Sequence, residues 1–197
     1  LNIENVQKEY EFNEYSPIGV SNVISEELLE LLKSYYRKTI NDKVFPLGDR
    51  QSNRFKAHNE PMSRFLHYEI LPLIEKIAGK KLKPTYTYLS AYVGDSDLPA
   101  HTDRQDCEYT VSFMIDKPEG LNWPIYVDLH KEKTKFTGRK MEYVNAENID
   151  HCVGIDCNPG GIMMFNGTDH MHFREKLEEE YCNVVLLHYR TLDGSYK

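Results

Sequence analysis

The stretch PGGIMMFNGTDHMHFREKLEEEYCNVVLLHYR, residues 159–190, decides the fold of this 197-residue chain. It contains three short runs, GGIMMF, HMHFREKL and YCNVVLLHYR, in which apolar and β-branched residues are concentrated, and such runs favour β-strands. Turn-forming Asn, Pro and Gly stand at 158–161 and 166–167, on either side of the first run. Short strands separated by Gly and Pro turns indicate a β-sandwich or a small barrel.

The same pattern of short apolar runs separated by turns extends upstream as far as residue 84. The runs TYTYLSAYV, EYTVSFMI and WPIYVDL are aromatic, β-branched and alternating, and they predict further strands. VGDSDLPA lies between the first two and is interpreted as a loop, whereas the long polar stretch after WPIYVDL is expected to hold short strands. Roughly seven or eight strands are therefore predicted in the C-terminal part of the chain.

The N-terminal third has a helical pattern instead. SEELLELLKSYY begins with Ser25 in an N-cap position and repeats apolar residues at helical spacing. A second helix is predicted from Pro61 to about Gly79, with Pro72 as a kink or break. KVFPLGDRQSNRFKAHNE, between the helices, is interpreted as a loop. Two helices ahead of a run of strands predict an α+β, mainly β fold in which the helices brace one face of the sheets.

Length and composition predict one domain over residues 1–197, with a hydrophobic content of 40% that suffices for a single core. The formal net charge of −7 argues against a nucleic acid or an anionic membrane surface as partner, since both reward basic patches. No apolar run could span a bilayer, and the polar, acidic start does not resemble a signal peptide. The four cysteines fit no CxxC zinc pattern, so we expect free thiols in a reducing cytoplasm, with a Cys152–Cys157 disulfide as the alternative.

The residues that carry chemistry begin with His101-Thr102-Asp103, in a loop between two predicted strands. Side chains at i and i+2 of an extended chain point to the same face, so an imidazole nitrogen and a carboxylate oxygen can reach one metal ion. His-x-Asp alone is a weak signal, but a second histidine cluster, DHMHFRE, follows in a later predicted strand. Two histidines and one carboxylate on one face of an octahedral ion form the facial triad of non-haem Fe(II) oxygenases, which leaves three positions open.

With these motifs in this order, the segment from about Tyr86 to Tyr189 resembles the double-stranded β-helix (jelly-roll) core of the Fe(II)/2-oxoglutarate-dependent dioxygenase superfamily, and its prolyl-hydroxylase-like branch in particular. The matching pieces are YLSAYVGD, DLPAHTD, EYTVSFMI, PGGIMMFNG, HFRE and the closing YCNVVLLHYR. The resemblance implies a jelly-roll core over about residues 84–191, preceded by supporting helices over about residues 20–80.

The resemblance also implies an enzyme that binds Fe(II), 2-oxoglutarate and O2, with ascorbate as a further candidate, and that hydroxylates an unactivated C–H bond. The substrate would be an amino acid, a peptidyl side chain or a small metabolite, and we expect the N-terminal helices and residues 128–158 to decide which. The basic run KEKTKFTGRK is interpreted as a solvated loop, with a lid over an anionic substrate as the alternative. Asp103 argues against halogenation, because halogenases of this superfamily lack the carboxylate.

Two histidines compete for the third metal-ligand position, because His170 and His172 share one strand face. We prefer His172, since HFRE resembles an H-[WF]-R-[DE] pattern of some bacterial oxygenases in the superfamily. His170 would then lie one step further out, over the mouth of the site. The histidines at 58, 67, 130 and 151 fit no ligand pattern and are expected at the surface, and His188 is expected in the core or at the rim.

An arginine is expected to pair with the distal carboxylate of 2-oxoglutarate, because a buried carboxylate without a partner is costly and a guanidinium matches its geometry. Many members of the superfamily place this cation on the closing strand, but the corresponding positions here, 181–183, are Tyr, Cys and Asn. We favour Arg174, which shares a strand face with His172 and lies about 6.5–7 Å further in. Arg104 and Arg190 are the rivals, and Arg104 would suit a substrate carboxylate equally well.

Two hydroxyl groups are expected beside the co-substrate. Tyr92 matches the tyrosine that ends this strand in prolyl-hydroxylase-like enzymes, and Ser112 lies on the inward face expected for the next strand. Trp123, the single tryptophan, is expected to pack rather than to act.

Two other functions remain as alternatives. A jelly roll with two histidines and a carboxylate could hold Zn or Mn in a cupin-type hydrolase or isomerase. Such cupins often add a glutamate as fourth ligand, and Glu108 is the only glutamate near the first histidine. A non-catalytic jelly-roll binding module is the second alternative.

Overall fold

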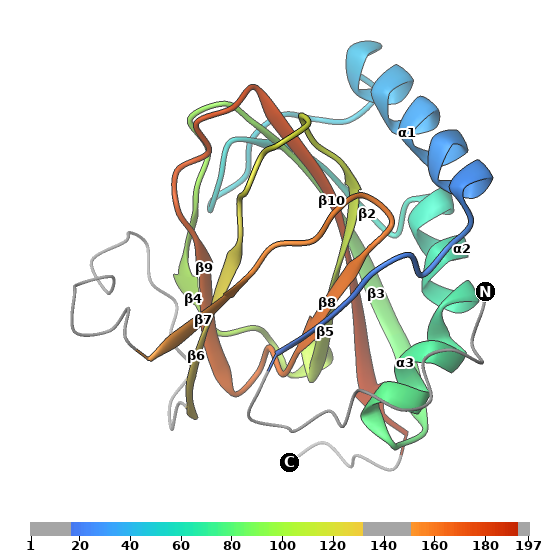
Figure 1. Ribbon diagram of the computed structural model, residues 1–197, viewed down its shortest axis with the longest axis vertical. Coiled ribbons are helices and arrows are strands. Elements are labelled where there is room, and N and C mark those ends of the chain that lie inside the picture. Colours follow the sequence, from blue (N-terminus) through green and yellow to red (C-terminus); the bar gives the residue numbers. More distant parts are fainter. Residues whose placement is uncertain (1–16, 132–150, 193–197) are drawn as a thin grey trace.

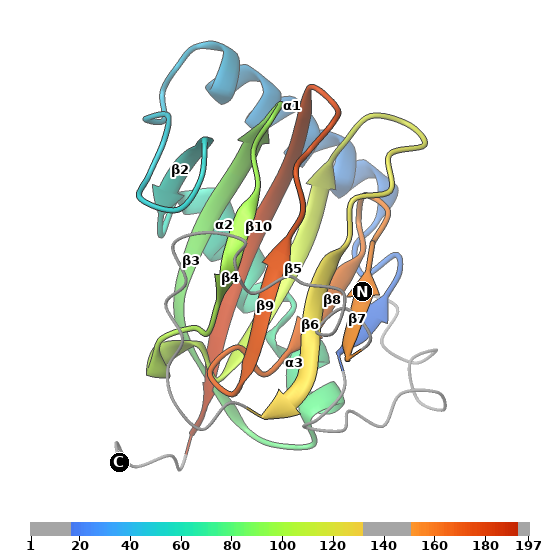
Figure 2. The same ribbon diagram turned by 90° about the vertical axis from the view of Figure 1, so that its left-hand side faces the viewer.

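The computed structural model describes residues 17–131 and 151–192, whose strands form two antiparallel sheets that face each other (Figures 1 and 2). The larger sheet runs in the order β1 (Ile18–Val20), β8 (Ile162–Phe165), β5 (Tyr109–Asp116), β10 (Tyr181–Thr191), β3 (Leu82–Val93) and β2 (Arg54–His58). The smaller sheet runs in the order β4 (Leu98–His101), β9 (His170–Arg174), β6 (Ile125–Lys131) and β7 (Cys152–Ile155).

From β3 onward the chain alternates between the two sheets, except that β6 and β7 are neighbours in one antiparallel pair. This alternation is the winding of a double-stranded β-helix, so the predicted mainly β, jelly-roll fold is confirmed. In the described parts of residues 82–191 there are eight strands, β3 to β10, in agreement with the seven or eight predicted. The winding leaves an interior between the sheets into which every second residue of a strand can point.

Three helices lie along the outer side of the larger sheet (Figure 1). They are α1 (Glu26–Asn41), α2 (Pro61–Glu69) and α3 (Leu71–Ala78). Ser25 caps α1 by accepting a hydrogen bond from the backbone N–H of Leu28, as its position predicts. The second predicted helix is two helices that meet at Ile70, because Pro72 lacks an N–H and is tolerated in the first turn of a helix but not inside one.

The larger sheet buries its outer face against the helices and turns its inner face toward the smaller sheet. On β3, Leu89 and Ala91 belong to the apolar core on the helix side, whereas Tyr88 and Tyr92 line a cavity between the sheets. A slip of one residue would exchange these two sets of side chains, so the helix-side core fixes which residues face the interior.

The segment KVFPLGDRQSNRFKAHNE was interpreted as a loop, but it contains the edge strand β2, which pairs with β3. Phe55 and Ala57 pack against the helix-side core, whereas Arg54, Lys56 and His58 line the cavity. The interpretation was wrong because charged side chains occupy the inward positions, where the usual strand pattern has apolar ones. Part of VGDSDLPA likewise forms β4, and the short strand β1 was not predicted.

The described residues include all four cysteines and the helices α1 to α3. All four cysteines are free thiols, so the alternative disulfide is not formed. None of the helices in ranges 17–131 and 151–192 combines the length and the apolar character that crossing a membrane requires. Residues 132–150, which include most of the basic run KEKTKFTGRK, lie outside the described residues.

His67 was expected at the surface, but it is fully buried on α2. Its ring packs against Tyr189 with the centroids 4.5 Å apart, and Nε2 lies 2.8 Å from the carbonyl oxygen of His188. Nδ1 has no hydrogen-bond partner among the described residues. Burial lowers the pKa of His67 to about 4, so the ring is neutral at pH 7.

This neutral histidine makes folding stability depend on pH. The unfolded chain takes up a proton at position 67 below about pH 6.5, whereas the folded protein does so only near pH 4. We therefore expect the free energy of unfolding to fall as the pH drops from 6.5 to 4, with a contribution from this residue of at most about 1.4 kcal/mol per pH unit.

The check is urea unfolding at pH 7 and pH 5 for the wild type and His67→Phe. The variant should lose less stability between the two pH values than the wild type does, whatever its absolute stability. An equal loss in both proteins would show that His67 titrates normally.

Candidate metal centre

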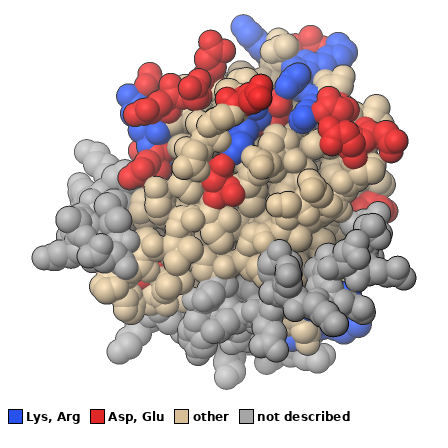
Figure 3. Space-filling view, viewed as in Figure 1, with Lys and Arg blue, Asp and Glu red and all other residues tan. Residues whose placement is uncertain are grey.

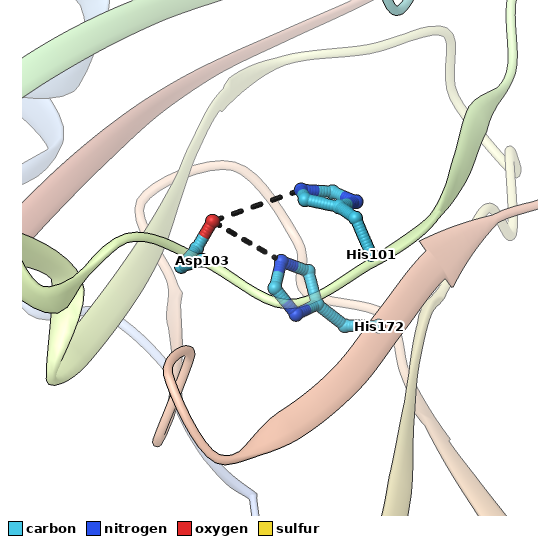
Figure 4. A group of neighbouring side chains, drawn as sticks. All are labelled: His101, Asp103 and His172. Carbon is cyan, nitrogen blue, oxygen red and sulfur yellow. Dashed lines mark ion pairs between the residues drawn. The ribbon is translucent and has the colours of Figure 1, made fainter. Parts of the chain in front are cut away.

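Strand pairing brings two distant histidines together. His101 ends β4, His172 lies in the middle of β9, and the two residues are direct partners in the β4–β9 register. Asp103 follows β4 in a loop that turns back toward both rings (Figure 4). Its Oδ1 lies 3.7 Å from Nε2 of His101 and 3.7 Å from Nε2 of His172. The three candidate ligand atoms lie within 4.8 Å of one another, so they can reach one metal ion.

Backbone carbonyls orient both imidazoles. Nδ1 of His101 donates to the carbonyl oxygen of Pro99 at 2.7 Å, and Nδ1 of His172 donates to that of His170 at 3.0 Å. A proton held at Nδ1 leaves Nε2 with its lone pair directed at Asp103, which is the form that binds a metal. Burial lowers the pKa of His172 to about 4, so this ring is neutral at pH 7.

The carboxylate of Asp103 is held by its surroundings on two sides. Its backbone N–H donates to the carbonyl oxygen of Gly167 at 2.7 Å, and the hydroxyl of Thr110 donates to Oδ2 at 2.7 Å. Nδ1 of His188 in turn donates to Thr110 Oγ1 at 3.1 Å. Burial opposes ionisation of Asp103, but the nearby histidines, His172 first, and the Thr110 hydroxyl outweigh it, so the pKa of Asp103 is lowered. Oδ1 is left for a metal.

Gly167 makes this arrangement possible by having no side chain. A Cβ at this position would collide with Oδ2 of Asp103 and with Oγ1 of Thr110. The turn at 166–167 therefore contributes close approach of the backbone as well as a change of direction. The turn is evident from the sequence, but this second role of Gly167 is not.

A second group, Asp103, Cys107 and His188, also brings possible ligand atoms together. Burial raises the pKa of the Cys107 thiol to about 12, so it stays protonated and is a poor ligand. Nδ1 of His188 is engaged with Thr110. Glu108, which a cupin-type site would need, accepts hydrogen bonds from the backbone N–H and the hydroxyl of Thr191 instead. The set of His101, Asp103 and His172 is therefore the better metal site.

The three residues border a cavity of about 590 Å³ between the two sheets, a size typical of small-molecule sites. Both sheets contribute to its walls, and so do β2 and the loop before it. Its aromatic and apolar lining residues include Tyr86, Tyr88, Tyr92, Leu98, Ile125, Phe165 and Leu186.

Arg174 lies at one end of this cavity with only 3% of its surface exposed. Nη1 donates to the carbonyl oxygen of Trp123 at 2.6 Å, Nη2 donates to Ser112 Oγ at 3.3 Å, and the guanidinium lies 4.6 Å from the centre of the Trp123 ring. Tyr92 packs edge-on against the same ring at 4.9 Å. Of the predicted residues, Arg174 and Tyr92 therefore both pack on Trp123, and Ser112 bonds to Arg174.

The rival candidates lie elsewhere. Arg104 lines the cavity at its exposed edge, with its guanidinium 5.2 Å from the centre of the Tyr86 ring. Arg190 is not among the cavity residues, and its Nη1 lies 4.0 Å from Asp106 Oδ1. His170 is buried rather than over the mouth, and its Nδ1 donates to the carbonyl oxygen of Asp128.

Arg54 is a cavity residue that sequence reasoning missed. It is 3% exposed and donates through Nε to Asp49 Oδ2 at 2.8 Å, through Nη1 to Tyr92 Oη at 2.8 Å and through Nη2 to Gln51 Oε1 at 3.1 Å. Tyr88 also donates to Asp49 Oδ2, at 2.7 Å. This network ties β2 and the preceding loop to β3. The alternation in RFKAH was the available signal, but it needed a polar interior to be recognised.

We expect Thr110→Val to weaken metal binding by about 10- to 100-fold without unfolding the protein, because it removes the hydroxyl that orients the Asp103 carboxylate. The measurement is a competition titration with a divalent metal and a chelating dye. Thr87→Val is the matched control, since this threonine is also buried and bonded through its hydroxyl, to Ser63 on the helix side. Equal weakening in both variants would contradict a specific role for Thr110.

Comparison of the amino-acid sequence with those of known proteins does not assign the chain to a family. No known protein-family profile matches the chain. Over 136 residues it is 26% identical to the ATP-dependent DNA helicase Hel308 of Methanocaldococcus jannaschii. That match covers 66% of this chain and 10% of the helicase, so the chain spans about a tenth of the relative's length and the match carries no assignment.

Solved structures resemble the chain over most of its length. A prolyl-4-hydroxylase of Pseudomonas putida is 8% identical and covers 96% of both chains with a TM-score of 0.65. The non-haem α-ketoglutarate-dependent carbocyclase SnoK of nogalamycin biosynthesis is 12% identical. The match covers 99% of this chain and 88% of SnoK, with a TM-score of 0.72. EctD of S. alaskensis, with bound Fe, is 14% identical. The match covers 95% of this chain and 76% of EctD, with a TM-score of 0.66. The fold of this chain is therefore the double-stranded β-helix fold of the 2-oxoglutarate/Fe(II) oxygenases.

Proposed function

We propose that this protein is a non-haem Fe(II) oxygenase that uses 2-oxoglutarate and O2 to hydroxylate an unactivated C–H bond of an amino acid, a peptidyl side chain or a small metabolite. The observation that carries the proposal is the convergence of His101, Asp103 and His172 on a cavity that also contains the buried Arg174. Two imidazoles and one carboxylate fit Fe(II) and leave positions for a chelating 2-oxo acid and for O2. When bound there, these groups supply oxidative decarboxylation coupled to hydroxylation.

Arg174 would hold the distal carboxylate of the co-substrate. Among the described residues no carboxylate lies within 4 Å of its guanidinium, although the side chain is almost completely buried. A buried cation without an anionic partner is costly, so the site is suited to an incoming anion. The carbonyl of Trp123 and the hydroxyl of Ser112 fix the guanidinium plane and leave other N–H groups for that anion.

Tyr92 and Ser112 would complete the co-substrate pocket. The hydroxyl of Tyr92 accepts a hydrogen bond from Arg54, so its own proton is left for a co-substrate oxygen. Ser112 accepts from Arg174 and keeps its proton in the same way. The Trp123 ring, which is 4% exposed, covers the guanidinium and keeps water away from the ion pair.

The first expected outcome is a weak visible metal-to-ligand charge-transfer band when Fe(II) and 2-oxoglutarate are added together in the absence of air. It requires iron and a chelating 2-oxo acid in one site, so neither a cupin-type hydrolase nor a binding module would produce it. Asp103→Ala should abolish the band, whereas Asp42→Ala, at the exposed end of α1, should leave it unchanged. A folded wild-type protein without the band would refute the proposed function.

The second expected outcome concerns the co-substrate alone. Arg174→Ala should weaken 2-oxoglutarate binding by about 10- to 100-fold, because a charged hydrogen-bonding partner is lost, and should change Fe(II) affinity far less. Both affinities come from anaerobic titrations that follow the charge-transfer band. Arg190→Ala is the matched control, since Arg190 does not line the cavity. If Arg174→Ala binds 2-oxoglutarate normally, Arg174 does not hold the carboxylate, and Arg104, the rival that lines the cavity, becomes the candidate.

A further inference from the structure

Cationic side chains are in excess around the cavity, although the chain as a whole carries a net charge of −7. Five arginine and lysine residues line it, against two carboxylates. The cations are Arg50, Arg54, Lys56, Arg104 and Arg174, and the carboxylates are Asp49 and Asp103. On the face shown in Figure 3, by contrast, Lys and Arg lie beside Asp and Glu. An Fe(II) ion and a doubly charged co-substrate would cancel each other, so the excess of positive charge would persist in the loaded site.

Two of these cations already have an assigned partner. Arg54 is paired with Asp49 at 2.8 Å, and the proposed function gives Arg174 the co-substrate. Lys56 and Arg104 have no carboxylate within 4 Å among the described residues, and both face the cavity. Two cations without anionic partners on the wall of one cavity favour an anionic ligand there.

Arg104 is held in position by an aromatic ring. Its guanidinium lies 5.2 Å from the centre of the Tyr86 ring, and Nη2 donates to the Tyr86 hydroxyl at 3.3 Å. Its guanidinium is charged at any working pH, as arginine is in proteins. Stacking orients the planar guanidinium and leaves its remaining N–H groups available for a second partner.

Lys56 reaches the same region from β2. Its neighbour on the inward face of β2 is His58, whose ring lies 5.8 Å from Tyr86 and 4.6 Å from Tyr88 between centroids. The pKa of His58 is lowered, first by burial and then by the charges of Arg104 and Lys56. Lys56, His58 and Arg104 all line the cavity, and an imidazole provides no anionic partner for either cation.

This region lies away from the co-substrate end of the cavity. Arg174 lies beside Trp123, which packs on Tyr92, whereas Arg104 lies over Tyr86, on the same face of β3. Six residues of extended chain separate the two tyrosines by about 20 Å. A five-carbon co-substrate has four carbon–carbon bonds of about 1.5 Å each and cannot serve both cation sites at once.

We propose that Arg104 and Lys56 bind an anionic group of the substrate, a carboxylate or a phosphate, while the rings of Tyr86 and His58 contact its body. The inference rests on the proposed function and names the class of substrate for it. Arg104 lines the same cavity as the metal-ligand candidate Asp103, so an anionic group bound by Arg104 would lie in the cavity that the metal site borders. The substrate is then a small acid or phosphate ester.

The experiment compares matched pairs of probes by calorimetry. One arm uses free amino acids and their carboxamides, the second uses short-chain phosphate monoesters and the parent alcohols, and each is run with and without Fe(II) and 2-oxoglutarate under anaerobic conditions. At least one acid or phosphate should bind about tenfold or more tightly than its neutral partner, and the arm in which it does identifies the anionic group. Equal binding within every pair would overturn the inference.

The variant Arg104→Gln/Lys56→Gln should remove that preference while it leaves the charge-transfer band and 2-oxoglutarate affinity intact. Arg64→Gln is a matched control, because Arg64 also lies over a tyrosine, Tyr68, at 5.3 Å and donates to its hydroxyl at 3.1 Å, but on α2. The control should keep the preference.

The outcomes separate the two proposals. A band without any anion preference overturns the inference and leaves the proposed function standing. An anion preference that depends on Arg104 and Lys56, without a band, supports the anion site and refutes the oxygenase. If the double variant instead loses 2-oxoglutarate affinity, these residues hold the co-substrate and the inference is wrong.

Discussion

The candidate site depends on the pairing of β4 with β9. The register of these strands makes His101 and His172 direct partners, although the sequence separates them by most of the jelly roll. Pairing across an antiparallel ladder fixes the distance between two side chains far better than a loop does. Asp103 then needs only the short turn after β4 to complete the set, and the carbonyl of Gly167 holds that turn.

The fold tolerates polar residues between the two sheets because its main apolar core lies on the helix side of the larger sheet. The helices bury the outer face of the larger sheet in one large cluster that includes Leu32, Leu66, Ile74, Leu89 and Val185. Hydrophobic burial there supplies most of the driving force for folding. The inner face can therefore hold buried arginines, histidines and an aspartate, provided that each finds a hydrogen-bond partner. Thr110, placed between Asp103 and His188, shows how such a group is satisfied.

Much of this could be predicted from the sequence, and the failures have a common cause. The strands from β3 to β10 follow ordinary alternation, and the grouping of His101, Asp103 and His172 follows from motif order. Strand β2 was missed because its inward positions are charged, and buried His67 was missed because one polar residue on a helix does not reveal which face it occupies. Gly167 looks like any turn glycine until the neighbouring Asp103 is seen. Sequence patterns assume that buried positions are apolar, so they fail where a buried position holds a polar side chain, whether in the cavity or, as at His67, beside the helix-side core.

Strand β2 lies at the edge of the larger sheet, and this position affects which cavity residues can be substituted. This strand bonds to β3 on one side, and Phe55 and Ala57 anchor it to the helix-side core. Its inward side chains border the mouth of the cavity, yet none of them is a candidate metal ligand. Lys56 and His58 can therefore be replaced without touching the β4–β9 ladder that aligns the two histidines. Arg54 differs from them, because its bond to Tyr92 ties the start of β2 to the neighbouring strand β3.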